Sequence, residues 1–386
     1  MLALRSSGAF VAAFALFTAT ACGGDDSGTT PASGGAGGAG GGSGGSAGTG
    51  AGGAAGTAGA AGAAGAAGAA WTEIYSVDLN LPAASNPPFS AGNAKFAFHA
   101  DVPYGTDPRT RFDIFLPESA TPTPLLIHIH GGGFVGGTKD GGYVADATHI
   151  TDLLAQGIAY ASIEYRVLAE VDDVGVIKPL TDCKRALQFI RHHADAFHIE
   201  KAKIVLEGGS AGAGTSLWLA FHDDMAHPSS QDPVDRESTR VLGAAANATQ
   251  ATYDLKKWDS VVFKDFGISF LDAAVQQGLG QRLYSFYGIQ SLPELETPKV
   301  QAYRADVDML AWMSADDPPF YVHNPLTPAT IPLDTNALFH HAFHARALTD
   351  QAKVAGVPAT AYIEALSVVD PSGKDDWAFA KDLLAP

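Results

Sequence analysis

The chain has 386 residues, with 24 Lys and Arg against 41 Asp and Glu, so its formal net charge at pH 7 is −17. This acidic balance argues against nucleic acid and anionic lipid surfaces as binding partners. The only cysteines are Cys22 and Cys183, which excludes a disulfide-rich scaffold and leaves the fold dependent on its hydrophobic core.

The first 22 residues have the features of an export signal. Arg5 precedes an apolar run at 9–17, and small residues lead to Cys22. The run is too short for a membrane-spanning helix. The sequence TATAC at 18–22 resembles a bacterial lipoprotein signal, in which the cysteine is lipidated. We therefore expect an exported cell-envelope lipoprotein that meets a membrane only through a lipid anchor at Cys22, or alternatively a secreted protein.

Residues 23–70 consist almost wholly of Gly, Ala, Ser and Thr. They cannot bury enough apolar surface to offset the entropy of ordering, which predicts a disordered linker. The remaining residues, 71–386, suit one large domain.

Within this domain, short β-rich runs alternate with amphipathic helical segments, which predicts an α/β fold with helices on both faces of a sheet. Residues 247–316 show helical pieces without a strand pattern, so we expect a helical insertion over the active face. The expected strands are 111–116, 125–130, 158–163, 204–206, 241–246, 318–323 and 359–366, and the main expected helices are 179–197, 338–354 and 377–384.

The sequence GGSAG at 208–212 lies between an expected strand and an expected helix. This is the context of the G-x-S-x-G nucleophile elbow, in which a serine occupies a strained turn and the flanking glycines avoid collisions with the neighbouring strand and helix. The helix that follows directs the positive end of its dipole toward the serine. Ser210 is therefore the candidate nucleophile.

The sequence HGGGF at 130–134 follows another expected strand. Glycines let backbone N–H groups turn toward a substrate oxygen without an obstructing Cβ. The N–H groups of Gly131, Gly132 and Ala211 are therefore the candidate oxyanion hole, which would stabilise the charge of a tetrahedral intermediate. The elbow follows after one more strand and one helix, and this order makes the two motifs more specific together than either is alone.

These motifs resemble those of the esterase branch of the α/β-hydrolases, which includes hormone-sensitive-lipase-like, feruloyl-esterase-like and kynurenine-formamidase-like enzymes. The resemblance implies a mostly parallel eight-stranded sheet and a serine hydrolase of carboxylic esters that needs no metal and no organic cofactor. It also implies that Tyr165 and Arg166 brace the site from below with Asp182 behind them, where the alternative is an ordinary surface salt bridge. The matching stretches are Tyr104-Gly105, RFDIFLP at 111–117, HGGGF at 130–134, EYRVLAE at 164–170, Asp182, GGSAG at 208–212 and DDPPF at 316–320.

Two members of the expected catalytic triad are not at their usual places. In α/β-hydrolases the base is a histidine after the last strand, and a carboxylate after the preceding strand orients it. Residues 367–376 follow the last expected strand and contain no histidine, and the last histidine of the chain is His344. Residues 323–332 follow the preceding strand and contain no carboxylate.

Two interpretations remain open. In the first, the base is His340 or His341, near the start of a helix whose N-terminal end lies at the same end of the sheet as the serine, and Asp334 or Asp317 orients the ring. A simpler role for these histidines is to cap or pack the helix start. In the second, the triad is broken, and the domain is a non-catalytic binding protein or an impaired hydrolase that keeps only the residual activity of its oxyanion hole.

The expected substrate is a small-molecule or polysaccharide-linked ester, and the sequence does not predict the oligomeric state. We do not expect His192, His193 and His198 to bind a metal, because adjacent side chains of a helix point about 100° apart. Aromatic residues of the insertion are candidates for a substrate pocket, with core packing as the alternative; they are Trp258, Tyr284, Tyr287, Tyr303 and Trp312.

Overall fold

The computed structural model describes residues 75, 78–276, 278–325, 330–332 and 334–385. The expected signal at 1–22 with its Cys22, and the expected linker at 23–70, lie outside the described residues. None of the helices in the described ranges combines the length and the apolar character that a bilayer-spanning segment needs.

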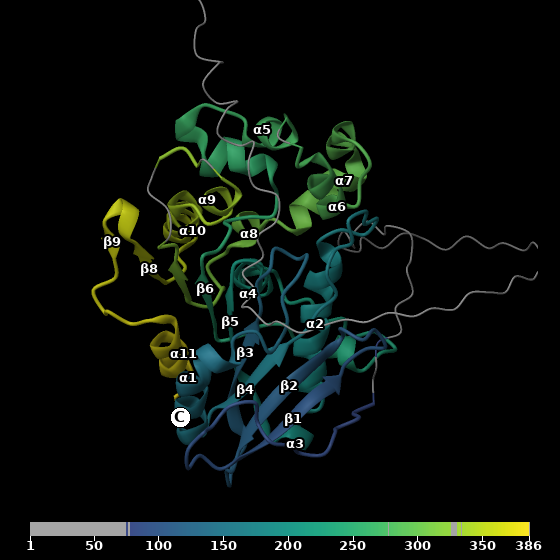
Figure 1. Cartoon of the computed structure of the whole chain (residues 1–386), viewed down its shortest axis with the longest axis vertical. Helices are drawn as coiled ribbons and strands as arrows, with labels where there is room; N and C mark the ends of the chain where they lie inside the picture. Colours follow the sequence, from purple (N-terminus) through teal and green to yellow (C-terminus); the bar gives the residue numbers. More distant parts are fainter. Residues whose placement is uncertain (1–74, 76–77, 277, 326–329, 333, 386) are drawn as a thin grey trace, which may run out of the picture. The chain divides into compact units, whose positions relative to one another are not determined.

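The described residues form one sheet with the strand order β1-β2-β4-β3-β5-β6-β7-β8-β9 (Figure 1). The strands from β4 to β8 in this order run parallel, whereas β1–β2, β2–β4 and β8–β9 pair antiparallel. The expected mostly parallel sheet is confirmed, but the expected count of eight strands is wrong. Two strands, β1 and β9, were not among the seven segments expected from the sequence; β9 has two residues, follows a 3₁₀ turn at Glu364–Leu366 and folds back along β8. The strands are β1 Phe96–Pro103, β2 Arg111–Pro117, β3 Thr123–Ile129, β4 Ala159–Ile163, β5 Ile199–Gly209, β6 Gly243–Asn247, β7 Phe320–His323, β8 Ala359–Ile363 and β9 Val368–Val369.

Helices cover both faces of the sheet. α1 and α11 pack on one face, and α2, α4 and α10 pack on the other. Because both faces are covered, a central strand such as β4 is buried at every position. The helices are α1 Tyr143–Ala155, α2 Ile177–His192, α3 Ala194–Phe197, α4 Ala211–Phe221, α5 Phe270–Gln276, α6 Gly280–Tyr287, α7 Pro298–Asp306, α8 Met309–Trp312, α9 Thr335–Phe339, α10 Ala342–Ala355 and α11 Asp376–Leu384.

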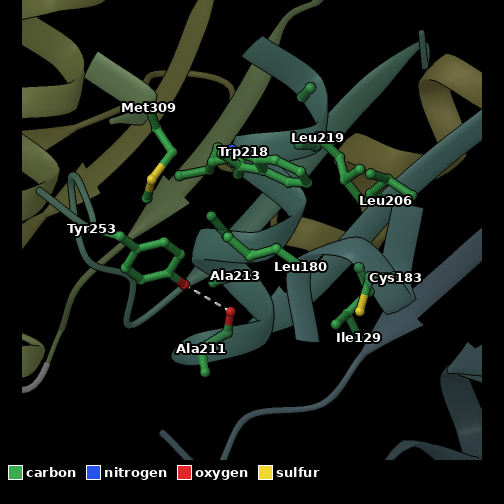
Figure 2. Packing of buried hydrophobic residues seen from close by; sticks show 14 of the residues in the cluster. Ile129, Leu180, Cys183, Leu206, Ala211, Ala213, Trp218, Leu219, Tyr253 and Met309 are labelled. Atoms are coloured by element: carbon green, nitrogen blue, oxygen red, sulfur yellow. Dashed lines mark hydrogen bonds between the residues drawn. The ribbon is translucent and has the colours of Figure 1, made fainter. Parts of the chain in front are cut away.

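The core between the sheet and α4 supports the turn that carries the candidate nucleophile. Figure 2 shows Cys183 of α2 beside Ile129 of β3, and Leu206 of β5 beside Leu219 of α4; all four side chains are buried. Burying one such aliphatic side chain stabilises the fold by roughly 1.5–3 kcal/mol. The end of β5 and the start of α4 are therefore fixed from below.

Two of the expected helices are interrupted. The segment expected as one helix at 179–197 divides at His193 into α2 and α3. The helix expected at 338–354 begins only at Ala342, and the short helix α9 precedes it. The second interruption matters for the site, because His340 lies in the gap between α9 and α10.

Between β6 and β7 the described residues contain α5, α6, α7 and α8, with short turns of other helical types, and no strand. Figure 1 shows α5, α6 and α7 together at one end of the sheet. Residues of α5 and α6 line a pocket with Ser210, so this segment lies over the carboxyl ends of the parallel strands.

Candidate active site

Ser210 forms a sharp turn between β5, which ends at Gly209, and α4, which begins at Ala211. Its φ of 52° and ψ of −115° are strained values for a residue with a side chain. The Ser210 N–H donates to the carbonyl oxygen of Asn247 at the end of β6, at 2.9 Å, which fixes the turn to the sheet. The side chain is half-buried and opens on a pocket.

The glycines around the turn are required by close packing. A Cβ on Gly208 would lie 2.6 Å from the carbonyl oxygen of Ile129, and a Cβ on Gly212 would collide with the same oxygen. The turn therefore presses directly against the end of β3, where the triglycine loop begins.

The triglycine loop lies next to the serine. A Cβ on Gly131 would be 3.5 Å from the Cβ of Ser210. Gly132 has a φ of 106°, and a side chain there would collide with the carbonyl oxygen of Gly136. Across the site, the N–H of Ala211 is the first of α4 and has no intrahelical acceptor. Of the three candidate donor residues, Gly131 and Ala211 thus lie directly beside Ser210.

Buried polar side chains hold this loop from behind. Tyr165 stacks on His130 with ring centroids 4.1 Å apart, and its hydroxyl donates to the His130 carbonyl oxygen at 2.7 Å. His130 lies 2.7 Å from the Gly131 carbonyl oxygen through Nδ1 and 3.1 Å from Glu164 Oε1 through Nε2. Burial acts to raise the pKa of Glu164, but the hydrogen bond and charge of His130 and the charge of Arg109 hold that pKa below its ordinary value.

The residues that the resemblance placed below the site form a buried pair. Arg166 Nε donates to Asp182 Oδ2 at 2.8 Å, and its Nη2 donates to Oδ1 at 2.5 Å. Both side chains are buried, so the alternative of an ordinary surface salt bridge is wrong.

His340 is the histidine next to Ser210. Its Nε2 lies 2.8 Å from the Ser210 Oγ, a hydrogen-bonding distance. The residue follows α9 with φ −116° and ψ 21°, values that end that helix before α10 begins. The side chain is half-buried, and burial lowers the pKa of its imidazole. A lowered pKa keeps the ring neutral, which is the form that can accept a proton from a hydroxyl.

The group that faces the other nitrogen of His340 is an amide. Asn336 Oδ1 lies 2.8 Å from His340 Nδ1. An amide oxygen only accepts, so Nδ1 carries the hydrogen and Nε2 presents its lone pair to Ser210. Sequence reasoning missed Asn336, because only carboxylates were considered for this role.

Two further amides hold the His340 segment in place. Asn324 follows β7 and is fully buried, and its Nδ2 donates to the carbonyl oxygens of His341 at 3.1 Å and His340 at 3.4 Å. Its Oδ1 accepts a backbone N–H from the loop after β6. Gln250 donates to the Phe339 carbonyl oxygen at 2.9 Å. Asn324 occupies the loop where the resemblance led us to expect a carboxylate, and it fixes the backbone of the histidine segment.

The two candidate acids make other contacts. Asp334 caps α9 by accepting the Ala337 N–H at 2.7 Å, and Asp317 pairs with Arg240 at 2.9 Å. Neither contact involves His340, and the amide of Asn336 lies where an orienting carboxylate was expected.

The other nearby histidines have structural contacts at both ring nitrogens. His341 is the N-cap of α10 and accepts the Phe343 N–H at Nδ1, while its Nε2 donates to the Thr330 carbonyl oxygen at 2.7 Å. His344 accepts the Ala251 N–H at Nδ1 and donates to the Leu338 carbonyl oxygen through Nε2. Of the two candidate bases, His340 contacts the serine, whereas both ring nitrogens of His341 bind backbone groups.

A pocket opens beside Ser210. Most of its lining is apolar or aromatic, and Trp258 is the one of the five aromatic candidates among the lining residues; Tyr287 and Tyr303 instead pack on each other with centroids 5.7 Å apart. No group of three or more His, Cys, Asp or Glu residues in the described ranges is arranged to hold a metal ion. The lining residues are Gly133, Phe134, Ser210, Ala211, Gln250, Tyr253, Leu255, Trp258, Phe270, Leu271, Ala274, Leu279, Arg282, Leu283, Phe286, Leu338 and Phe339.

Tyr253 connects the pocket wall to the elbow. Its hydroxyl donates to the Ala211 carbonyl oxygen at 2.9 Å, as Figure 2 shows, and its ring packs edge-on against Phe134. The wall of the pocket is therefore hydrogen-bonded directly to Ala211, one of the candidate oxyanion donors.

Comparison with known proteins identifies the family and the fold of the chain. A family model described as BD-FAE matches residues 112–341, which is more than half of the chain. Among curated relatives, phenmedipham hydrolase of Pseudarthrobacter oxydans is 32% identical over 158 residues, which cover 39% of this chain and 31% of that protein. A probable isoprenylcysteine alpha-carbonyl methylesterase of Arabidopsis thaliana is 26% identical over 141 residues, covering 36% and 28%. The match thus spans less than a third of the length of either relative.

Among solved structures, a truncated form of a carbohydrate esterase from gut microbiota aligns with a TM-score of 0.51 and 16% identity, covering 70% of this chain and 88% of that one. A bifunctional GH43-CE protein of Bacteroides eggerthii aligns with a TM-score of 0.51 and 16% identity, covering 74% and 37%. At this level of identity the likeness shows the fold alone. It confirms the α/β-hydrolase fold that the sequence motifs predicted.

Proposed function

Because the chain belongs to the BD-FAE family of α/β-hydrolases, we propose that it is a serine hydrolase of carboxylic esters. Ser210 is the nucleophile, His340 the general base, and the N–H groups of Gly131, Gly132 and Ala211 the oxyanion hole. The observation that carries this proposal is the 2.8 Å distance between Ser210 Oγ and His340 Nε2. A serine hydroxyl becomes an effective nucleophile only when a base at hydrogen-bonding distance takes its proton.

The reaction follows from these roles. His340 Nε2 accepts the hydroxyl proton as Ser210 Oγ bonds to the ester carbonyl carbon, and the carbonyl oxygen becomes an anion that receives backbone N–H hydrogen bonds. The C–O bond to the alcohol then breaks, and Nε2–H gives its proton to the departing oxygen. Water attacks the resulting acyl-serine with the same base and releases the acid. Each oxyanion donor contributes roughly 2.7–4 kcal/mol to transition-state stabilisation.

Asn336 is the positioning residue for the base. Its carbonyl oxygen accepts the Nδ1 hydrogen, which keeps the Nε2 lone pair toward the serine. An amide dipole stabilises the imidazolium that forms during the reaction less than a carboxylate would, because it carries no net charge. We therefore expect a lower rate of ester hydrolysis than for an enzyme with an aspartate at this position.

Aromatic and aliphatic side chains make up most of the pocket lining, so the pocket suits a substrate with an apolar group on one side of the cleaved bond. The names of similar proteins include a carbohydrate esterase and a methylesterase. We propose a small-molecule or polysaccharide-linked ester as the substrate. No metal and no organic cofactor enters the proposed reaction.

The experiment that tests this function compares the purified chain with Ser210→Ala. The wild-type protein is expected to hydrolyse 4-nitrophenyl butyrate and to be labelled by a fluorophosphonate, and the variant to do neither. Hydrolysis at the same rate by both proteins would contradict the proposal.

A second candidate function is a binding protein or an impaired hydrolase of the same fold. The observation that favours it is the neutral amide of Asn336 where a carboxylate is usual. In that case the wild-type chain would react with the fluorophosphonate no faster than His340→Ala, while ester analogues would still bind in the pocket.

The location of the protein is proposed from residues 1–22 alone. Their export signal and Cys22 support a lipoprotein of the cell envelope, or a secreted protein if the cysteine is not lipidated. Mass spectrometry of the mature N-terminus from the native host distinguishes the two.

A further inference from the structure

One charged side chain lines the pocket beside Ser210. The wall contains residues such as Phe134, Trp258 and Leu283, and Arg282 of α6 adds a guanidinium to it. No Asp or Glu is among the lining residues. The pocket is therefore positively charged, although the chain as a whole carries a net charge of −17.

Arg282 lies between the two segments that hold the candidate catalytic groups. Its guanidinium carbon is 5.5 Å from the centroid of the Phe339 ring, and Phe339 directly precedes His340. On the other side, its Nη2 lies 2.6 Å from the position that a Cβ on Gly133 would take. A group bound to this guanidinium would thus be close to an ester held at Ser210.

Among the residues that the structure describes, none forms an ion pair with Arg282 or accepts a hydrogen bond from it. The few positions between 78 and 385 that lie outside the described ranges contain no Asp or Glu. Burial lowers the pKa of Arg282, as expected for a cation without a compensating anion. By its accessible surface the residue is nevertheless exposed, and it lines the pocket. Other arginines of the described chain do pair with carboxylates; they are Arg109, Arg111, Arg166, Arg185, Arg240, Arg304 and Arg346.

We propose that Arg282 binds a carboxylate of the substrate, so that the preferred substrate is an ester with one carboxylate group near the cleaved bond. This inference rests on the proposed ester hydrolysis and names its substrate class. The planar guanidinium matches a carboxylate through two parallel N–H donors. The apolar wall accommodates the hydrocarbon between the carboxylate and the ester, and the anion supplies the counter-charge that the protein does not provide.

The test uses matched pairs of esters that differ in one charge. Monomethyl adipate and methyl hexanoate differ on the acyl side, and 4-acetoxybenzoate and 4-acetoxybenzamide differ on the alcohol side. The measured quantity is the ratio of kcat/KM for the anionic ester to that for its neutral partner. The pair with the larger ratio identifies the side of the ester that faces Arg282.

The wild-type ratio is expected to exceed 1 for one of the pairs. Arg282→Gln lowers that ratio about 10- to 100-fold, because a hydrogen-bonded ion pair is lost, and Arg282→Lys gives an intermediate ratio because it keeps the charge without the two-pronged geometry. The control is Arg236→Gln. Arg236 is exposed, donates to the Ser230 carbonyl oxygen at 2.8 Å and does not line the pocket, so its ratio equals that of the wild type.

The failure of this inference is distinguishable from failure of the proposed function. If the wild-type chain hydrolyses the neutral esters and the ratio is the same in Arg282→Gln, or if both rates fall equally, the carboxylate role is overturned and ester hydrolysis stands. If no ester is hydrolysed, calorimetry with Ser210→Ala still applies. Binding of monomethyl adipate that disappears in Ser210→Ala/Arg282→Gln supports the inference, and equal binding by both proteins overturns it.

Discussion

The Nδ1 of His340 lies 2.8 Å from the Oδ1 of Asn336, four residues earlier in the chain. The imidazole beside Ser210 is thus oriented by a neutral amide, on a segment that follows β7 rather than the last strand of the sheet. This relationship explains how the chain can have an intact elbow and triglycine loop without a histidine at the usual place.

The first prediction concerns the charge of this orienting group. Asn336→Asp adds a carboxylate at the same distance, which stabilises the imidazolium and is expected to raise kcat/KM for 4-nitrophenyl butyrate at pH 8–9 by up to about 10-fold. Asn336→Ala removes one neutral hydrogen bond, and a loss of about 2- to 10-fold is expected.

Asp334→Ala is the control for this experiment. It removes the cap of α9, at a cost of about 0.5–2 kcal/mol in stability, and leaves Asn336 in place. A larger loss of kcat/KM in Asp334→Ala than in Asn336→Ala, at equal folded fraction, would show that the orienting group is the aspartate.

The second prediction concerns pH. The base must be neutral to act, so kcat/KM falls as the pH drops through the pKa of His340. Because burial lowers this pKa, the acidic limb of the pH profile is expected below the ordinary value of 6.5. Asn336→Asp raises the pKa and moves the limb to higher pH. A wild-type limb above 6.5, or no movement in the variant, would contradict the assignment of His340.

The sequence alone predicted the fold, the candidate nucleophile and the candidate oxyanion loop. The elbow and the triglycine loop depend on backbone geometry that only glycine permits, so GGSAG and HGGG are visible in the sequence without the structure. Strands such as β4 were recognisable as continuous apolar runs. β1 and β9 were missed; the two residues of β9 have no periodic pattern.

The proposed base and its partner were harder to predict because they depend on a break in a helix. Residues 338–354 have a continuous helical pattern, yet the chain turns at His340, where Asn324 and Gln250 bind the backbone carbonyl oxygens. These contacts come from residues far away in sequence. One available signal was overlooked: Asn336 and His340 are four residues apart, a spacing at which side chains of one helical turn meet.

The third prediction separates backbone geometry in the oxyanion loop from a general effect of mutation. Gly132→Ala forces a side chain into a left-handed conformation and against Gly136, and kcat is expected to fall about 10²- to 10³-fold as the loop shifts. Gly136→Ala is the matched control, since a Cβ there meets no atom within 4 Å. Equal kcat values for the two variants would argue that the loop does not stabilise the oxyanion.

The fourth prediction concerns acid stability. Burial lowers the pKa of His344 to about 3, against an ordinary value of 6.5. The unfolded chain therefore binds a proton that the folded chain does not in this window, so the free energy of unfolding decreases as the pH falls below 6.5 toward 3. The slope from this residue is at most about 1.4 kcal/mol per pH unit.

Urea unfolding between pH 7 and pH 4 measures this slope. His344→Asn keeps an acceptor for the Ala251 N–H and has no titrating ring, so it is less stable at pH 7 but has a shallower dependence on pH. The same slope in the variant and the wild type would assign the acid sensitivity to other groups.

The most direct test of the account is the rate at which a fluorophosphonate modifies Ser210, followed by peptide mass mapping in the wild type, His340→Ala and His341→Asn. We expect Ser210 to be the modified residue in the wild type and its rate to fall at least about 10³-fold in His340→Ala. His341→Asn should react within about threefold of the wild type, because asparagine also caps a helix. Equal rates in the wild type and His340→Ala, or modification at another residue, would contradict the pairing of Ser210 with His340.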